Sequence, residues 1–182
     1  MNDKWKVFFA VPFSDENRKA LQKNLIESEI QLPEREIESS NWHITIFFVG
    51  MMDCSKVAPL IQTLSGRSWP RKFEISLNHL GAFPDINRAQ VLWWGVGTGK
   101  DELHELAQIL TNFLQDLGFT TDPKSFQGHL TLSRLRQPKD LRKLLNTPLK
   151  PVSVSVNRFV LFRSRSEAGF QRYEELASFR LI

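Results

Sequence analysis

The chain has 182 residues, of which 41% are hydrophobic and 24% charged, and this size and composition exclude a multidomain machine and a disordered protein. Its longest apolar run, residues 44–52, is too short to span a bilayer, so we expect no membrane contact. The charged N-terminal residues show no secretion-signal pattern, and the one cysteine, Cys54, excludes an internal disulfide. We therefore expect a cytoplasmic protein. The net charge of +4 is uneven, because residues 124–182 hold 12 basic and 4 acidic side chains whereas residues 1–123 hold 12 and 16.

The first third of the chain alternates between predicted strands and helices. We expect strands over Lys4–Pro12 and residues 42–49, the second closed by Gly50, because both are rich in β-branched and aromatic residues. Ser14 suits a helix N-cap, and a further helix is expected over residues 55–64.

The middle of the chain combines a hairpin with a helix. Residues 72–80 and Ala89–Val96 read as antiparallel strands joined by turn residues. The clearest helix is expected over residues 100–117, where apolar residues recur at i, i+3, i+4 and i+7. Its apolar face requires a sheet to pack against.

The last third is predicted as a strand over residues 128–134, a helix over 138–145, and two strands over 152–162 and 171–181 around Gly169. Mixed strands and helices with hairpins indicate an α+β fold.

A four-residue pattern, His-aliphatic-Thr-aliphatic, occurs twice, starting at His43 and at His129. Both copies lie in predicted strands, where side chains alternate between faces, so Thr45 shares a face with His43 and Thr131 with His129. A lone histidine on a strand is usually structural. The duplication instead favours a functional role for the histidine and threonine of each copy.

Two histidines facing one centre suit displacement at a phosphodiester. One imidazole accepts a proton from the attacking oxygen, and the other donates a proton to the leaving oxygen. Because the unperturbed pKa of histidine is about 6.5, one imidazole can be charged and the other neutral near pH 7. Threonine hydroxyls and backbone N–H groups can bind the phosphate oxygens.

Other chemistries have little support in the sequence. Neither copy has a further carboxylate or cysteine at metal-ligand spacing, so we expect no metal. Cys54 has no nucleophile signature, and no glycine-rich phosphate loop occurs, so we expect no cofactor. His79 lacks a threonine companion and His104 lies off the apolar stripe of its helix, so both are interpreted as structural or solvated residues.

The basic C-terminal region has two open interpretations. It can form a field that attracts phosphates, or it can be a solvated face. The candidate field consists of Arg134, Arg136, Lys139, Arg142, Lys143, Arg158, Arg163, Arg165 and Arg172.

With both motifs placed, the chain resembles the two-histidine (2H) phosphoesterase superfamily and its bacterial RNA 2′,3′-cyclic phosphodiesterase branch, also called 2′-5′ RNA ligases. The resemblance covers nearly the whole chain. It rests on the segments around the two motifs, 41–50 (NWHITIFFVG) and 129–134 (HLTLSR). It also rests on residues 7–11 (VFFAV), 81–84 (GAFP), 91–93 (VLW) and 161–164 (LFRS), with Tyr173.

The resemblance implies one two-lobed domain over residues 1–182, with pseudo-two-fold symmetry and antiparallel sheets backed by helices. Both motifs would meet in a central cleft. The implied reaction opens a 2′,3′-cyclic phosphate at an RNA end to a 2′-phosphate without metal or ATP. Members can also join RNA ends through a 2′-5′ linkage.

By the same resemblance, His43 is the general acid that protonates the departing 3′ oxygen, and His129 is the general base that activates water. The near-symmetric motifs also permit the reverse assignment. Thr45 and Thr131 would hold phosphate oxygens. Arg134 would bind phosphate, although strict alternation points it away from His129, so it needs a strand end or a β-bulge to reach the site.

Two alternatives remain at this stage. The same chemistry can act on a small cyclic nucleotide or a 2′-5′ oligonucleotide. The second alternative is a non-catalytic RNA-binding module in which exposed Phe83, Trp93 or Trp94 stack on bases. Whichever function applies, we expect a monomer.

Overall fold

The computed structural model describes residues 3–120, 126–167 and 170–182, which form one eight-stranded antiparallel sheet with helices around it. The strands are β1 (Lys4–Pro12), β2 (His43–Asp53), β3 (Phe73–Phe83), β4 (Ala89–Val96), β5 (His129–Lys139), β6 (Val152–Val156), β7 (Arg158–Glu167) and β8 (Phe170–Arg180). The helices are α1 (Asp15–Glu27), α2 (Val57–Ser65), α3 (Lys100–Asp116) and α4 (Arg142–Leu145), with short 3₁₀ turns at Ser39–Asn41 and Cys54–Lys56.

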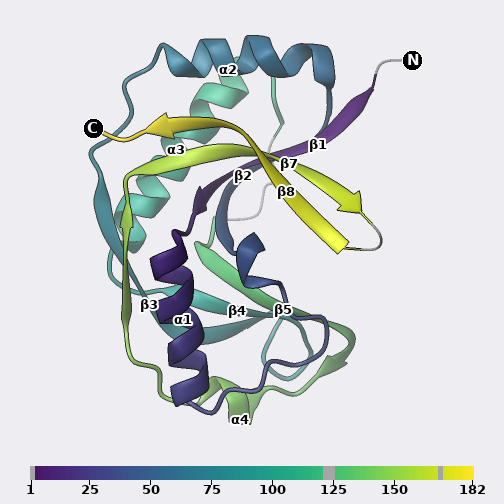
Figure 1. Ribbon diagram of the computed structural model, residues 1–182, viewed down its shortest axis with the longest axis vertical. Coiled ribbons are helices and arrows are strands. Elements are labelled where there is room, and N and C mark those ends of the chain that lie inside the picture. Colours follow the sequence, from purple (N-terminus) through teal and green to yellow (C-terminus); the bar gives the residue numbers. More distant parts are fainter. Residues whose placement is uncertain (1–2, 121–125, 168–169) are drawn as a thin grey trace.

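The sheet consists of two four-stranded halves that meet at the two histidine strands (Figure 1). Its strand order is β6-β3-β4-β5-β2-β1-β7-β8, so β5 is the inner strand of one half and β2 of the other. The halves join where Ile44 of β2 pairs with Leu130 of β5. The prediction of a two-lobed α+β fold is confirmed. The two sheets that the resemblance implied are joined into one continuous sheet at this pair.

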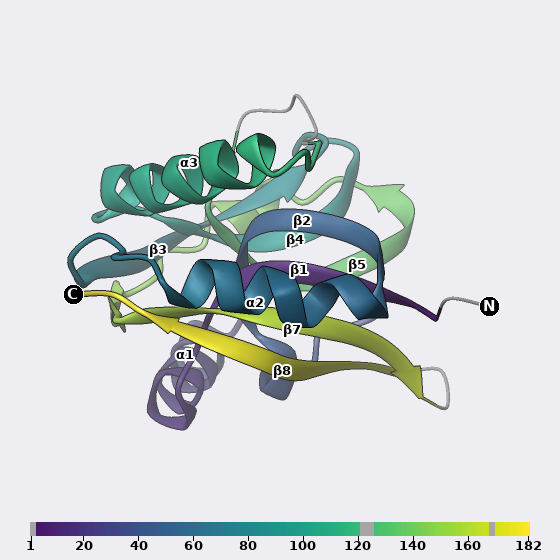
Figure 2. The ribbon, with the colours of Figure 1, turned by 90° about the horizontal axis from the view of Figure 1, so that it is seen from above.

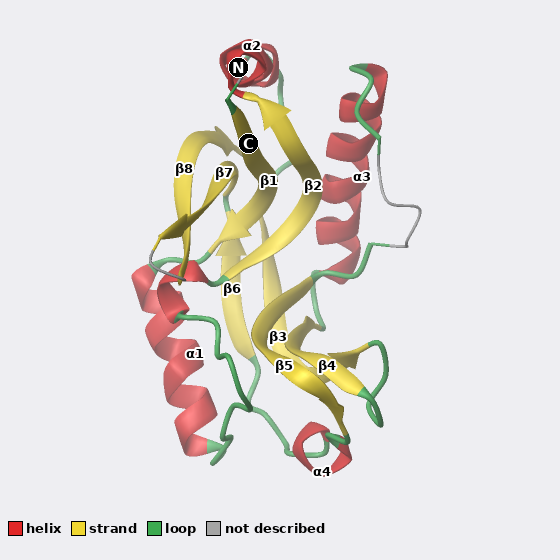
Figure 3. Ribbon diagram, turned by 90° about the vertical axis from the view of Figure 1, so that its right-hand side faces the viewer, coloured by secondary structure: helices red, strands yellow, loops and turns green. Residues whose placement is uncertain are grey.

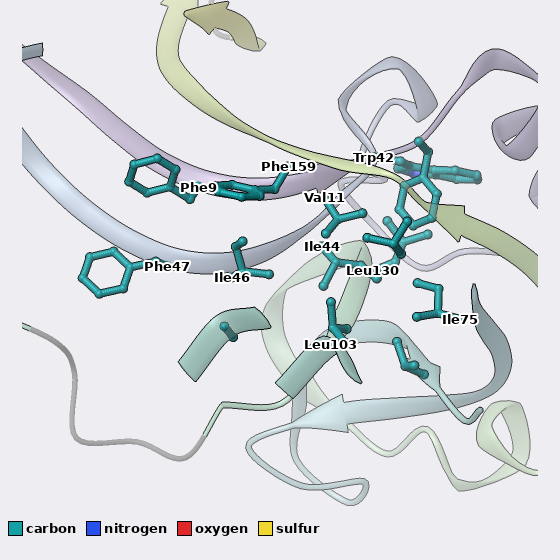
Figure 4. Close-up of a cluster of buried hydrophobic side chains, with 14 of the residues drawn as sticks. Phe9, Val11, Trp42, Ile44, Ile46, Phe47, Ile75, Leu103, Leu130 and Phe159 are labelled. Carbon is teal, nitrogen blue, oxygen red and sulfur yellow. The ribbon is translucent and has the colours of Figure 1, made fainter. Parts of the chain in front are cut away.

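Apolar side chains on the faces opposite the histidines form the core. Ile44 and Leu130 are 0% and 1% exposed, and they lie beside Leu103 of α3 (Figure 4). Most of the predicted apolar stripe of α3 is buried, but Leu117, which lies just beyond the end of the helix, is 44% exposed. Helices α3 and α1 lie on opposite sides of the strands (Figures 2 and 3). No helix among the described residues is long and apolar enough to cross a bilayer.

Ser14 caps α1 as predicted, because its side chain accepts a hydrogen bond from the backbone N–H of Asn17 at 3.1 Å. The prediction that Gly50 closes the second strand is wrong. β2 continues to Asp53 through a bulge in which Val49 is the extra residue, and Gly50 adopts a φ of 84°. Glycine tolerates this conformation, so the strand bends without ending.

Two predictions near the C-terminus are also corrected. The strand expected over residues 152–162 is two strands separated at Asn157: β6 pairs with β3 in one half, and β7 pairs with β1 in the other. The helix expected over residues 138–145 is only the single turn α4, because β5 extends through Pro138 to Lys139. The expected turn residue Gly169 lies outside the described residues.

Candidate active site

Both histidine strands carry a β-bulge at the third residue after the histidine. On β2 the extra residue is Ile46, because Thr45 pairs with Ala10 and Phe47 with Phe9. On β5 it is Leu132, because Thr131 pairs with Trp93 and Ser133 with Leu92. Each bulge reverses the alternation of the residues that follow it.

The reversal brings the fifth residue after each histidine back to the histidine's side of the sheet. Two consecutive residues are buried in each strand, and the next, Phe48 or Arg134, is exposed and lines the same cleft as the histidines. The bulge required for Arg134 to reach the site is therefore present. The same device places Phe48 at the equivalent position of the other half.

A cleft of about 650 Å³ between the halves brings all five predicted site residues together. It is lined by His43 and Thr45 from β2 and by His129, Thr131 and Arg134 from β5. Among the described residues, no carboxylate lines it. Such a cleft favours an anionic ligand, because Arg134 has no negative neighbour there to neutralise it.

Hydrogen bonds fix both imidazole rings in the same way. Nδ1 of His43 lies 2.7 Å from the carbonyl oxygen of Asn41, and Nδ1 of His129 lies 2.7 Å from that of Gln127. A carbonyl only accepts, so each Nδ1 carries a proton and donates it. In the neutral ring Nε2 is then the basic nitrogen, and in the charged ring it is the nitrogen that can donate to a ligand.

His43 has an additional partner, since its Nε2 lies 3.1 Å from Oγ1 of Thr45. With His43 neutral, the Thr45 hydroxyl donates to Nε2. The pair is the contact expected when histidine and threonine share one face of a strand.

The pKa values of both histidines depart from the unperturbed value expected from sequence. Burial lowers the pKa of His43 to about 4, and the positive charges of His129 and Arg134 act in the same direction, against the hydrogen bond to the Asn41 carbonyl. Burial also lowers the pKa of His129, with Arg134 adding to the effect. Both imidazoles are therefore mainly neutral at pH 7 in the unliganded protein, which corrects the expectation that one of them is charged.

Aromatic rings enclose each histidine. The ring centroid of His43 lies 5.0 Å from that of Tyr173, which meets it edge-on, and 5.0 Å from that of Phe8. His129 lies 5.0 Å from Phe83, also edge-on, and 5.9 Å from Trp93. These rings cover part of each half-buried imidazole, and this partial loss of hydration lowers the pKa values.

The premise of the RNA-binding-module alternative is wrong for two of its three aromatic residues. Trp93 is 6% exposed and Trp94 is 0% exposed, so neither can stack on a base. Phe83 is half-buried and packs against Trp93 and His129. Phe83 and Trp93 therefore support the ring of the second histidine.

The predicted basic field is largely neutralised by ion pairs. Carboxylates lie within 4 Å of Lys139, Arg142, Arg158, Arg163, Arg165 and Arg172. Within the described ranges, no such pair involves Arg134, Arg136 or Lys143. Of the predicted basic field, only Arg134 therefore lines the cleft, with no carboxylate within 4 Å among the described residues.

The remaining candidate residues lie away from the cleft. His104 is exposed on α3, and His79 packs edge-on against Trp93 and bonds to the side chain of Asn78, as their structural interpretation predicts. Cys54 is half-buried in a 3₁₀ turn. Within the described residues, no three histidine, cysteine or acidic side chains gather in a way that could hold a metal ion.

Among the further residues that line the cleft, the sequence did not assign Lys6, Phe48 or Tyr173 to the site, although Tyr173 was part of the resemblance. A signal for Phe48 existed, because it follows His43 by five positions as Arg134 follows His129. Lys6 and Tyr173 come from β1 and β8, and nothing in their local sequence indicates which strand neighbours them.

Known proteins share both the sequence and the fold. A model of the 2′-5′ RNA ligase superfamily matches residues 17–168. A protein of Aeropyrum pernix named RNA 2′,3′-cyclic phosphodiesterase is 33% identical over 114 residues, which cover 63% of this chain and 64% of that protein. A protein of the same name from Geobacillus stearothermophilus is 31% identical over 187 residues, which cover 96% of this chain and 57% of that protein. The chain thus matches less than two thirds of the length of these two relatives. The Escherichia coli protein of the same name is 25% identical over 183 residues, covering 100% of this chain and 99% of that one.

Two crystal structures have the same fold. Escherichia coli LigT complexed with 3′-AMP has a TM-score of 0.78 at 24% identity, covering 98% of this chain and 99% of that chain. The protein TT0787 of Thermus thermophilus has a TM-score of 0.79 at 22% identity, covering 97% of each chain. The superfamily match spans most of the sequence and includes both histidine strands, and so the chain belongs to the 2′-5′ RNA ligase superfamily.

Proposed function

We propose that this protein hydrolyses the 2′,3′-cyclic phosphate at an RNA end to a 2′-phosphate. The observation that carries the proposal is the pair of imidazoles with equivalent Nδ1 hydrogen bonds, which line one cleft together with Arg134 and no described carboxylate. The printed names of the relatives agree with this activity. Escherichia coli LigT has been crystallised with the nucleotide 3′-AMP, which supports a nucleotide as the ligand.

In the proposed reaction, a water oxygen attacks phosphorus and the bond from phosphorus to O3′ breaks. His129 accepts the proton of the attacking water at Nε2, and His43 donates a proton from Nε2 to the departing O3′. The products are a 2′-phosphate and a free 3′-hydroxyl. Proton exchange with solvent then restores both histidines.

Thr45, Thr131 and Arg134 are proposed to hold the non-bridging oxygens. Two hydroxyls supply neutral donors, and the guanidinium supplies a planar, charged pair of donors suited to phosphate. Their interaction strengthens as negative charge grows on these oxygens in the transition state.

Because the pKa values of both histidines are lowered in the unliganded protein, the bound substrate must help to protonate the general acid. The negative charge of a bound phosphodiester favours the protonated imidazole and offsets the effect of Arg134. Bound substrate therefore raises the pKa of the general acid toward neutrality. The assignment of acid to His43 and base to His129 follows the resemblance, and exchanging the roles leaves the geometry unchanged because both rings have the same Nδ1 hydrogen bond.

Ligation uses the same displacement. When the 5′-hydroxyl of a second RNA takes the place of water, it attacks phosphorus, O3′ leaves, and a 2′-5′ linkage forms. A small cyclic nucleotide fits the same chemistry, because the reacting atoms are identical.

The direct test incubates an RNA oligomer ending in a 2′,3′-cyclic phosphate with the wild type, His43→Ala and His129→Ala, in excess chelator. The wild type should form a 2′-phosphate, and each substitution should reduce turnover about 10²- to 10⁴-fold, the usual contribution of a general acid or base. His104→Ala, at an exposed site on α3, is the matched control and should retain activity.

Each other outcome has a defined meaning. No turnover of cyclic-phosphate RNA by a folded wild type contradicts the proposed function. Turnover retained in both substituted proteins contradicts the two-histidine mechanism. Loss on adding chelator contradicts the metal-independent scheme.

We further propose that residues 1–182 act as one domain, as a monomer, in the cytoplasm. The sheet is continuous across both halves, which supports a single folding unit. One cysteine in the whole sequence agrees with a reducing compartment. Light scattering after gel filtration tests the monomer, with a dimer mass as the contrary result.

A further inference from the structure

The two halves of the sheet share a single strand pair. Among the described residues, β2 and β5 pair only at Ile44 and Leu130, and away from this pair the two strands diverge (Figure 3). Because the twist between paired strands ranges over about 10–35° in sheets, one pair does not fix how the side chains beside it face each other. The two histidines flank this pair, so a further contact between the halves is needed to set their separation.

A bridging segment, residues 34–41, precedes β2 and bonds to both halves. Its first part lies along the edge of β5 that β2 leaves free: the backbone N–H of Ile37 donates to the carbonyl of Leu132 at 2.8 Å, and that of Arg134 donates to the carbonyl of Arg35 at 3.3 Å. Leu132 is the bulge residue that turns Arg134 into the cleft. The bridging segment therefore holds β5 where the direction of Arg134 is set.

The second part of the bridging segment bonds to the half that carries His43. The carbonyl of Ile37 accepts a hydrogen bond from the indole Nε1 of Trp42 at 2.9 Å. The side-chain amide of Asn41 donates to the carbonyl of Gln171 on β8 at 2.8 Å, and the carbonyl of Asn41 holds Nδ1 of His43. The two backbone groups of Ile37 thus bond to opposite halves, its N–H to one and its carbonyl to the other.

The indole of Trp42 is well placed to hold Ile37. Trp42 is 4% exposed and belongs to the hydrophobic core that also contains Ile44 and Leu130 (Figure 4). Its ring is therefore fixed relative to the pair that joins the halves, while its N–H reaches Ile37, which is half-buried and lines the cleft. A carbonyl at such a site is costly to leave without a donor, so the contact persists in the folded protein.

We propose that Trp42 and Ile37 are positioning residues that set the separation of His43 and His129 across the cleft. This proposal rests on the proposed function, because only a reaction that needs both histidines at one phosphorus depends on that separation. Neither residue transfers a proton. Weakening their contact lets the halves move relative to each other, so both imidazoles engage the same phosphate less often.

The first test removes the indole N–H and keeps a buried ring. With an RNA oligomer ending in a 2′,3′-cyclic phosphate, Trp42→Phe should lower kcat about three- to tenfold, the range of one hydrogen bond, with a smaller change in KM. Trp69→Phe is the matched control. Trp69 is also 4% exposed but packs against Phe159 and Phe179, so this substitution should keep kcat.

A double-substitution cycle separates positioning from folding. The residual reaction of His43→Ala uses one histidine and does not depend on the separation. Adding Trp42→Phe to His43→Ala should therefore change the residual single-turnover rate by less than about twofold. Partial unfolding would instead lower the rate by the same factor with and without His43, and urea denaturation at the assay pH measures the folded fraction directly.

Hydrogen exchange at the indole N–H tests the contact without turnover. A ligand that binds both halves and needs the contact must strengthen it in return. Inorganic phosphate, at a concentration that shifts the imidazole resonances of both histidines, should slow the exchange of the Trp42 indole N–H and leave that of Trp69 unchanged.

An unchanged kcat in Trp42→Phe overturns the proposal, and so does an equal loss in Trp69→Phe or in the His43→Ala background. Exchange at Trp42 that phosphate does not slow also overturns it. If the wild type turns over no cyclic-phosphate RNA, the proposed function fails and the positioning role fails with it. Turnover by the wild type together with any of the preceding results defeats the positioning role alone.

Discussion

The lowered pKa of His43 couples the stability of the protein to pH. The pKa is about 4 in the folded protein and near ~6.5 in an unfolded chain, so between these values the unfolded state binds the extra proton. Stability from this group is complete above the unfolded value and is lost as the pH falls toward the folded value. His43→Gln removes the titration while keeping an amide that can donate to the Asn41 carbonyl.

The magnitude follows from the two pKa values. Because one pKa unit corresponds to about 1.4 kcal/mol, protonation of His43 lowers the free energy of unfolding by about 2 kcal/mol at pH 5 and about 3 kcal/mol at pH 4. Carboxylates titrate in the same range, but they do so in both proteins. The difference between the wild type and His43→Gln therefore isolates the histidine.

Urea denaturation at pH 7, 6, 5 and 4.5 measures the effect. The free energy of unfolding of the wild type should fall about 2 kcal/mol more than that of His43→Gln between pH 7 and 5. An NMR titration of the imidazole should place its pKa well below 6 in the free protein and higher with inorganic phosphate bound. A titration near 6.5 in the free protein, with parallel pH profiles of stability, would refute the attribution to burial.

Further predictions concern the cleft and the joint between the halves. Arg134→Gln should lower kcat/KM about a hundredfold and Arg134→Lys should recover part of it, whereas an equal loss in both would implicate the guanidinium geometry alone. Thr45→Val and Thr131→Val should each lower kcat about tenfold with serine restoring it, and failure of serine to restore kcat would mean that the methyl group, not the hydroxyl, matters. Ile44→Ala at the joint should cost about 2–5 kcal/mol of unfolding free energy in chemical denaturation, against little change for the exposed control Ile26→Ala, and equal effects would contradict the packing described. The pH profile of kcat/KM should be bell-shaped with its maximum below pH 6.5, because burial lowers both histidine pKa values, and a maximum above pH 7.5 would argue against these groups.

Local patterns in the sequence predicted much of the fold. The apolar repeat over residues 100–117 was sufficient to predict α3, and the predicted C-terminal end of this helix differs from the observed one by a single residue. Alternation along the strands was also sufficient to place Thr45 beside His43, and their side chains are in contact. These features depend on neighbours a few residues apart, which the sequence specifies directly.

Features that depend on pairing between distant segments were not predictable. The run over residues 152–162 is β-rich throughout, and only its pairing with β3 and β1 in opposite halves divides it at Asn157. Phe8 and Tyr173 reach His43 from other strands. No local periodicity encodes which strands become neighbours in a sheet.

The sequence by itself determined the two histidine motifs, the face that each histidine shares with its threonine, and the resemblance that led to the superfamily. The resemblance implied that the motifs meet in one cleft, and the tertiary structure places both there. The tertiary structure alone decided that bulges at Ile46 and Leu132 turn Phe48 and Arg134 into that cleft and that both imidazoles are neutral at pH 7. The reason is physical. Side-chain alternation is a property of one strand, whereas register, burial and the pKa values that follow from burial are properties of the strands and rings that surround it.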